Sequence, residues 1–137
     1  MKRLFIDAGA FLAAANPGDQ HQQDAARGWR LIEDEPFELI SSEHVLDEVV
    51  TGIARVQGGR RAARWAREHL SEGLFHWLQP TAADLRHAID LMEKFHDQDL
   101  SFTDAISFAL MARMKIRSVF GFDHHFALAG FEFLPGE

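Results

Sequence analysis

Short apolar runs alternate with amphipathic segments along the whole chain. The apolar runs predict four strands and a fifth at an edge, over residues 2–6, 37–40, 75–78, 118–122 and 131–134. Apolar spacing, caps and breakers predict helices between them, over residues 10–15, 19–33, from Ser41 or Ser42 to Gly58-Gly59, 60–71, 81–96, from Ser101 onward, and briefly after Asp123. This alternation predicts an α/β fold: a three-layer α/β/α sandwich around a mostly parallel sheet of four to five strands.

The same periodicity predicts which helix faces are buried. The expected inward residues are Ala25, Ala26, Trp29 and Ile32; Val45, Leu46, Val49, Val50, Ile53 and Val56; Leu85, Ala88, Ile89, Met92 and Phe95; and Ala105, Ile106, Ala109, Leu110 and Ala112. No repeat, low-complexity tract or Pro/Ser-rich linker divides the chain. Residues 1–137 are therefore expected to form a single domain.

Composition narrows the class of protein. Apolar residues make up 47% and charged residues 26% of the chain, which is typical of a globular protein and not of a disordered one. No apolar run approaches the roughly 18 residues of a membrane span, and Asp7 interrupts the first apolar run too early for a signal peptide. The absence of cysteine excludes disulfides, zinc–thiolate sites and iron–sulfur clusters. We therefore expect a soluble, cytoplasmic protein without a membrane partner.

The net charge of −7 disfavours a general nucleic-acid coat protein, which is usually basic. It does not exclude a nuclease, because acids that hold a divalent cation contribute to such a charge. The basic residues are unevenly placed, since one stretch without Asp or Glu carries Arg55, Arg60, Arg61, Arg64 and Arg67. Guanidinium groups suit phosphate oxygens, so this stretch is a candidate surface for RNA or for an acidic partner. A solvated helix face is the alternative.

Four acids are expected at one edge of the predicted sheet. Asp7 and Asp123 follow the first and fourth strands, while Asp104 and Glu48 lie in the first and second turns of their helices. Sites in open parallel sheets form outside the carboxyl ends of the strands. Each acid also has a local explanation: Asp7 as a strand end, Asp104 as part of a capping box that starts at Ser101, Asp123 as a helix N-cap and Glu48 as a solvated helix residue. The prediction therefore depends on the four coinciding.

Carboxylates brought together repel one another, and a hard dication such as Mg²⁺ or Mn²⁺ removes that cost. Such a cation lowers the pKa of a bound water and offsets charge on phosphoryl oxygens. The sequence therefore predicts metal-assisted phosphodiester hydrolysis at Asp7, Glu48, Asp104 and Asp123. His124 and His125 follow the last acid, but hard cations prefer oxygen ligands, so we expect a loop pair with one exposed ring.

The chain resembles the PIN-domain family, and within it the VapC-type toxins of bacterial toxin–antitoxin pairs. The segments that carry the resemblance are residues 4–10, residues 45–49, residues 99–108, residues 119–126, and the closing Ala129-Gly130-Phe131 with Leu134-Pro135. The resemblance implies a single PIN-like nuclease domain, commonly dimeric, that cleaves single-stranded or loop RNA with Mg²⁺ or Mn²⁺. It also implies inhibition by a cognate antitoxin.

The resemblance also assigns roles to the four acids. Asp7 and Asp104 would be the main metal ligands, Asp123 would complete the pocket, and Glu48 would orient or deprotonate the attacking water. The expected products are a 5′-phosphate and a 3′-hydroxyl. The family usually has Ser or Thr after the first acid, where this chain has Ala8, so Thr103 is the remaining candidate for a supporting hydroxyl.

Other functions stay open at this point. One is a PIN-like module that binds RNA or protein without cleaving, and another is an RNA-processing nuclease without an antitoxin. Retention of four acids argues against an inactive module. A dehalogenase-type phosphotransferase needs a second Asp two residues after the first, where this chain has Gly9. A phosphoacceptor receiver domain is disfavoured because neither Lys94 nor Lys115 stands in the required context.

Overall fold

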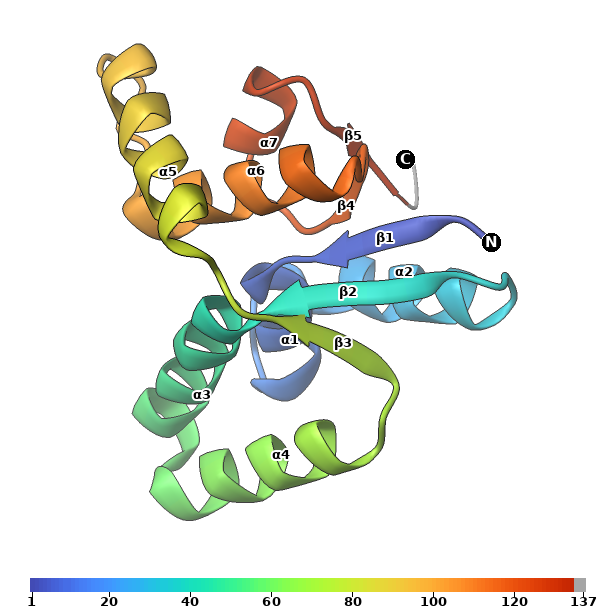
Figure 1. The fold of residues 1–137 in the computed structure, drawn as a ribbon. Coiled ribbons are helices and arrows are strands. Elements are labelled where there is room, and N and C mark those ends of the chain that lie inside the picture. The colour runs from blue at the N-terminus through green and yellow to red at the C-terminus, as the bar shows by residue number, and fades with distance from the viewer. Residues whose placement is uncertain (135–137) are drawn as a thin grey trace.

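The computed structural model describes residues 1–134 and contains a five-stranded, all-parallel sheet between two layers of helices (Figure 1). The strands are β1 (Arg3–Ile6), β2 (Glu38–Ser42), β3 (Phe75–Leu78), β4 (Ser118–Phe120) and β5 (Glu132–Phe133). The helices are α1 (Ala8–Ala15), α2 (Gln22–Glu33), α3 (Glu43–Gln57), α4 (Gly59–Ser71), α5 (Ala82–Lys94), α6 (Phe102–Met114) and α7 (His125–Leu128). The predicted three-layer fold is confirmed. Pro135, which belongs to the last motif of the resemblance, lies outside the described residues.

The strand order is β3-β2-β1-β4-β5, so the chain first builds the sheet outward from β1 in one direction and then in the other. In Figure 1, α1 to α4 lie on one side of the sheet, and α5 to α7 lie on the other. The order reverses between β1 and β4, whose ends are in register at Ile6 and Phe120. This is the position where open parallel sheets form a crevice at the carboxyl ends of their strands.

The centre of the sheet is apolar on both faces because helices cover both. Leu4, Phe5, Ile6 and Val119 have no exposed surface. This explains why the first strand reads as a continuous apolar run and not as an alternating one.

Several predicted boundaries shift by a few residues. β4 ends at Phe120 instead of residue 122, because its pairing with β1 ends at Ile6 and Phe120 and the chain bends at Gly121. β2 extends to Ser42, whose hydroxyl then accepts the backbone N–H of Val45 and caps α3. No helix within residues 1–134 is both long and apolar enough to span a membrane.

Some predicted inward residues are wrong. Val56, Leu85 and Ile89 are 62%, 37% and 55% exposed, and Ala26 and Ala112 are also exposed. Helical periodicity predicts which side of a helix faces the core, but not how much of that side the core covers. On α5 the buried contact with the core narrows to Ala88, with Met92 and Phe95 half-buried beside it, and this leaves Leu85 and Ile89 uncovered in the single chain.

Candidate active site

An open cleft of about 370 Å³ lies where β1 and β4 end. Its lining residues are Asp7, Gly9, Leu12, Glu48, Asp99, Ser101, Asp104, Phe122, Asp123 and His125. The four acids singled out in the sequence therefore line one cleft, although they come from four separate segments. Asp7 follows β1, Glu48 is on α3, Asp104 is on α6 and Asp123 follows β4.

Asp7 is the most buried of the four acids, with 5% of its surface exposed. Its Oδ1 is the buried side-chain atom that lacks a hydrogen-bond partner among residues 1–134. Burial, and to a smaller extent the nearby charges of Glu48 and Asp123, raise the pKa of Asp7 to about 7, although the backbone N–H of Ala8 opposes this rise. A buried carboxylate oxygen that receives no N–H or O–H donor is chemically suited to bind a cation.

Gly121 keeps the side chain of Asp7 in this position. A Cβ atom at residue 121 would lie 2.8 Å from the Cβ of Asp7, which is closer than such atoms approach.

We predict that Gly121→Ala displaces Asp7 and weakens Mn²⁺ binding at least about tenfold, as changes beside metal ligands commonly do. Titration calorimetry measures this effect. Gly9→Ala is the matched control, because its Cβ meets its nearest neighbour at an ordinary 3.5 Å, and equal affinities of the two variants would contradict the prediction.

Asp104 lies in the first turn of α6, where the capping-box alternative would turn its side chain back to the helix end. The Ser101 hydroxyl accepts the backbone N–H of Asp104 at 3.1 Å. The reciprocal bond from the acid is absent there, whereas Thr81 and Asp84 form both bonds at the start of α5. The carboxyl of Asp104 instead lines the cleft beside Asp123.

The pKa values of these two carboxyl groups shift in opposite directions. Burial, a hydrogen bond to Asp123 and the charge of Asp7 raise the pKa of Asp104 well above its usual range. Partial burial opposes ionisation of Asp123, but the hydrogen bonds from Asp104 and His125 lower its pKa. Asp104 therefore holds the proton and Asp123 the charge. Glu48 is exposed at the rim, and partial desolvation and the charge of Asp123 raise its pKa.

His125 lines the cleft. The sequence pattern, which predicted only a loop pair of histidines, did not predict this position. Its Nδ1 lies 2.7 Å from Oδ1 of Asp123, and its Nε2 lies 2.6 Å from the carbonyl of Gln98. With a carbonyl on one side and a carboxylate on the other, both nitrogens donate, and these contacts raise the pKa of His125 against its burial. The His125 side chain is 13% exposed, whereas that of His124 is 82% exposed, which matches the one exposed ring that was expected.

A histidine metal site is a poor description of this region. Within residues 1–134, the three side chains whose ligand atoms lie within 4.8 Å of one another are those of Asp123, His124 and His125. His125 already uses both nitrogens, so it has no lone pair to offer. Among residues 1–134, no three of the four acids have ligand atoms within 4.8 Å of one another, so Mg²⁺ held by them would keep some of its waters, as that ion usually does.

A second set of residues missed in the sequence joins the two helices that carry acids. The ring of His44, one turn before Glu48 on α3, lies 2.7 Å from the hydroxyl of Ser42 and 3.2 Å from that of Ser107 on α6. Burial lowers the pKa of His44 to about 4, so the ring is neutral. Ser107 is one turn after Asp104. No sequence pattern links residues 44 and 107, because only the fold brings them together.

Thr103 has a different environment from the one expected of a supporting hydroxyl. Within residues 1–134, its side chain makes no hydrogen bond to the four acids, and its backbone instead contacts His44. Ala8 is buried beside Asp7 and contributes its backbone N–H.

The arginine stretch separates into two parts. Its five arginines, Arg55, Arg60, Arg61, Arg64 and Arg67, are all exposed. Arg60, Arg64 and Arg67 line a surface cleft of about 640 Å³ along α4. Arg61 instead donates to Gln57 at 3.4 Å, and Arg55 is on α3.

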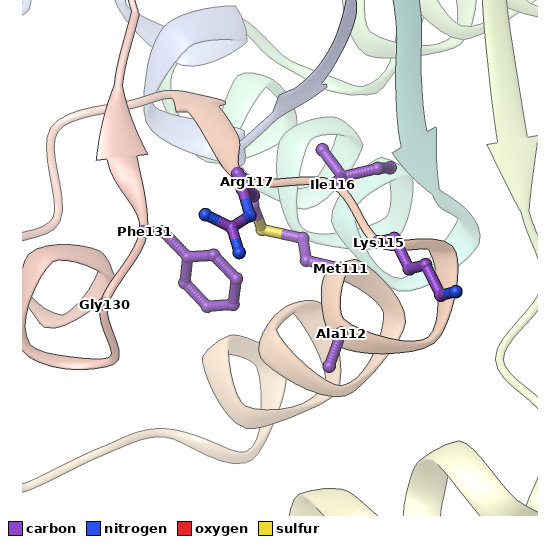
Figure 2. A pocket seen from close by; sticks show the side chains of 7 residues that line it. All are labelled: Met111, Ala112, Lys115, Ile116, Arg117, Gly130 and Phe131. Carbon is purple, nitrogen blue, oxygen red and sulfur yellow. The ribbon is translucent and has the colours of Figure 1, made fainter.

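Another cavity, of about 460 Å³, lies at the opposite edge of the sheet, before β4 and β5 begin. Figure 2 shows the side chains of Lys115, Arg117 and Phe131 around it. Among residues 1–134, no carboxylate lines this cavity, so its described lining does not share the chemistry of the acid cleft.

The comparison with known families identifies the class of protein to which this fold belongs. The PIN domain family matches residues 4–132. The chain therefore belongs to the PIN-domain family, whose members are nucleases, and the predicted enzyme class is confirmed at this level.

Among individual proteins, the chain is similar to the 23S rRNA-specific endonuclease VapC20 of Mycobacterium tuberculosis, with 33% identity over 129 residues, 93% of this chain and 95% of VapC20. The crystal structure of VapC20, described as a Sarcin-Ricin loop cleaving toxin, matches with a TM-score of 0.84 and 31% identity over 93% of this chain and 95% of that one. The resemblance to VapC-type toxins is thereby confirmed.

A more distant structure shares the fold alone. VapBC2 from Rickettsia felis, bound to a DNA fragment from its promoter, has a TM-score of 0.69 and 11% identity over 96% of each chain.

Proposed function

We propose that this protein is a Mg²⁺- or Mn²⁺-dependent endoribonuclease that hydrolyses phosphodiester bonds in single-stranded or loop RNA. The observation that carries the proposal is the buried, unpartnered Oδ1 of Asp7 in a cleft that Glu48, Asp104 and Asp123 also line, with Asp99 at its rim. VapC20, similar over most of its length, is an rRNA endonuclease, which supports RNA as the substrate class. We propose that the protein acts in the cytoplasm, where an RNA substrate of the kind that VapC20 cleaves would be met.

In the proposed mechanism, Asp7 and Asp104 hold the cation and Asp123 completes the set. When bound, the cation supplies Lewis-acid stabilisation of the phosphoryl oxygens and activates a water. Glu48, at the open rim, takes the proton of the attacking water, and its raised pKa suits a general base. The water oxygen forms a new bond to phosphorus as the bond between phosphorus and O3′ breaks. The O3′ alkoxide that leaves takes a proton from solvent in the open cleft, so the products are a 5′-phosphate and a 3′-hydroxyl. His125 keeps Asp123 ionised and fixes its orientation.

The activity assay tests this proposal. With Mn²⁺, the protein is expected to cut a single-stranded RNA at defined positions and to leave 5′-phosphate ends. EDTA abolishes this cleavage, and added Mn²⁺ restores it. Specific RNA binding without any cleavage would instead support an inactive PIN-like module.

We further propose that the protein is the toxin of a type II toxin–antitoxin pair, neutralised by a protein antitoxin. VapC20 is described as a toxin, and a cell that makes such a nuclease needs a means to restrain it. A short neighbouring reading frame for a small DNA-binding protein would support this pairing, whereas an isolated gene would favour an RNA-processing role.

The face formed by Arg60, Arg64 and Arg67 is the candidate surface for RNA phosphates or an acidic antitoxin segment.

We predict that Arg64→Glu with Arg67→Glu weakens RNA or antitoxin binding at least about tenfold and makes the remaining affinity less sensitive to salt, because charge-assisted contacts are lost. Fluorescence anisotropy at two salt concentrations measures both effects. Arg61→Glu is the control, since its guanidinium is turned to Gln57. Unchanged affinity for both RNA and antitoxin would mean that these arginines form a solvated helix face with no role in binding.

We propose a homodimer that covers the exposed apolar residues of α5. Leu85 and Ile89 lie one turn apart on this helix and remain uncovered in the single chain.

We predict that Ile89→Glu converts the dimer to a monomer in sedimentation velocity, because burying an unpaired charge at an interface costs free energy. Val56→Glu, on α3, serves as the control at an equally exposed apolar site. A parent protein that sediments as a monomer at micromolar concentration would contradict the proposal.

A further inference from the structure

The acid cleft has an apolar wall that the proposed metal chemistry does not use. Leu12, Gly9 and Phe122 line this wall, and Phe122 directly precedes Asp123. The ring of Phe122 is half-buried and stacks on the ring of His21, with centroids 4.3 Å apart and planes 7° from parallel. Its other aromatic neighbour, Phe120, meets it edge-on at 6.1 Å.

Gly9 keeps part of this ring open toward the cleft. A Cβ atom at residue 9 would lie 3.5 Å from Cδ2 of Phe122, so any larger side chain there would cover the ring edge. The backbone does not require glycine, since residue 9 lies inside α1 and is not among the glycines with positive φ. The absence of a side chain at residue 9 is therefore better explained by access to the ring than by backbone conformation.

RNA is a ligand that combines the two properties of this cleft. A nucleotide has a phosphate, which the cation and the acids would bind, and a flat base, which aromatic side chains recognise by stacking. Since Phe122 and Asp123 are consecutive and line the same cleft, the ring is within reach of a base next to a phosphate held at the acids. A cleft that bound only phosphate would gain nothing from an apolar wall.

We propose that Phe122, supported by His21, is the stacking platform for the nucleobase adjacent to the scissile phosphate. This inference rests on the proposed ribonuclease function and adds a base-binding subsite to it. Because every base has a π-face, the platform tolerates all four bases and requires only that the base be unstacked, as in a single strand or a loop.

Steady-state cleavage with an abasic substrate tests the platform. The parent first maps the cut site in a single-stranded RNA, and the flanking nucleotides are then made abasic one at a time. At the platform position, loss of the base is expected to lower the kcat/KM of the parent about 5- to 150-fold, the range for base–aromatic stacking. Phe122→Ala is expected to lower kcat/KM for the intact RNA by a similar factor. The kcat/KM of this variant should not fall further when the RNA is made abasic. Phe122→Trp should keep the parent's kcat/KM and its discrimination.

Two further variants separate a subsite from a folding effect. Phe131→Ala removes a half-buried ring at the opposite edge of the sheet (Figure 2) and is expected to keep the parent's abasic penalty. Gly9→Leu covers the Phe122 ring without removing it and is expected to reproduce the loss in kcat/KM even if Phe122→Ala folds poorly. An abasic penalty that is equal in the parent, Phe122→Ala and Gly9→Leu would overturn the platform while leaving the nuclease intact. No cleavage of any RNA by the parent would overturn the proposed function itself.

Discussion

Asp104→Asn is expected to lower Mn²⁺-dependent RNA cleavage by at least about 100-fold while the protein stays folded. Loss of a group that merely supports a metal ligand commonly costs 10- to 100-fold, so loss of a ligand charge should cost more. Asparagine has the same shape, and the cap from Ser101 uses the backbone N–H of residue 104, which the substitution keeps. Single-turnover rates with Mn²⁺ and circular dichroism melting measure activity and folding separately.

Asp99→Asn is the matched control for this variant. Asp99 is exposed at the rim of the same cleft and has a φ of 55°, a left-handed conformation that asparagine also adopts readily. We expect its cleavage rate to stay within about threefold of the parent, because an exposed carboxylate at the rim that holds no cation contributes little, and asparagine keeps its shape and backbone conformation. If Asp104→Asn cleaved as fast as Asp99→Asn, the assignment of Asp104 to the metal site would be wrong.

Asp7→Asn is expected to stabilise the metal-free protein at pH 8, although it destroys the site. The folded pKa of Asp7 is raised from 3.8 to about 7, so the folded state holds a proton that the unfolded chain releases. The stability that this proton provides is complete below pH 3.8 and is lost as the pH rises toward 7. Because a tenfold difference in proton affinity between the folded and unfolded states is worth about 1.4 kcal/mol, the total for Asp7 is on the order of a few kcal/mol.

The comparison is made by chemical denaturation at pH 5 and pH 8 in EDTA. The free energy of unfolding of the parent should fall between these values, and more steeply than Asp7 alone requires, because the pKa of Asp104 is also raised. The fall should be smaller in Asp7→Asn, whose amide is neutral at both pH values. Mn²⁺ at 100 times its Kd should return about 2.7 kcal/mol to the parent and much less to the variant. Parallel pH profiles of the two proteins would contradict the burial of an ionisable Asp7.

The acids were predictable because their positions follow from strand ends and helix starts. Asp7 and Asp123 each come after a short apolar run, and parallel topology brings such residues to one edge. Asp104 required the fold, since its side chain does not return to the helix end as the capping-box pattern suggested. This sequence pattern predicted where the helix begins, but it did not predict which way the side chain of Asp104 points.

Contacts across long separations were not predictable from one sequence. The bridge from His44 to Ser107 spans 63 residues, and the bond from His125 to the carbonyl of Gln98 spans 27. Both arise because the segment between β3 and β4 crosses from one side of β1 to the other. The exposure of Leu85 and Ile89 was likewise hidden, because an apolar stripe has the same spacing whether this chain or a second copy covers it.

Anomalous X-ray diffraction from a crystal soaked in Mn²⁺ tests the central claim most directly. We expect one strong manganese peak, or two neighbouring peaks, among the carboxylates of Asp7, Asp104 and Asp123, with Oδ1 of Asp7 within bonding distance. A peak confined to His124 and His125, or acid side chains that point away from one another with no peak between them, would contradict the account.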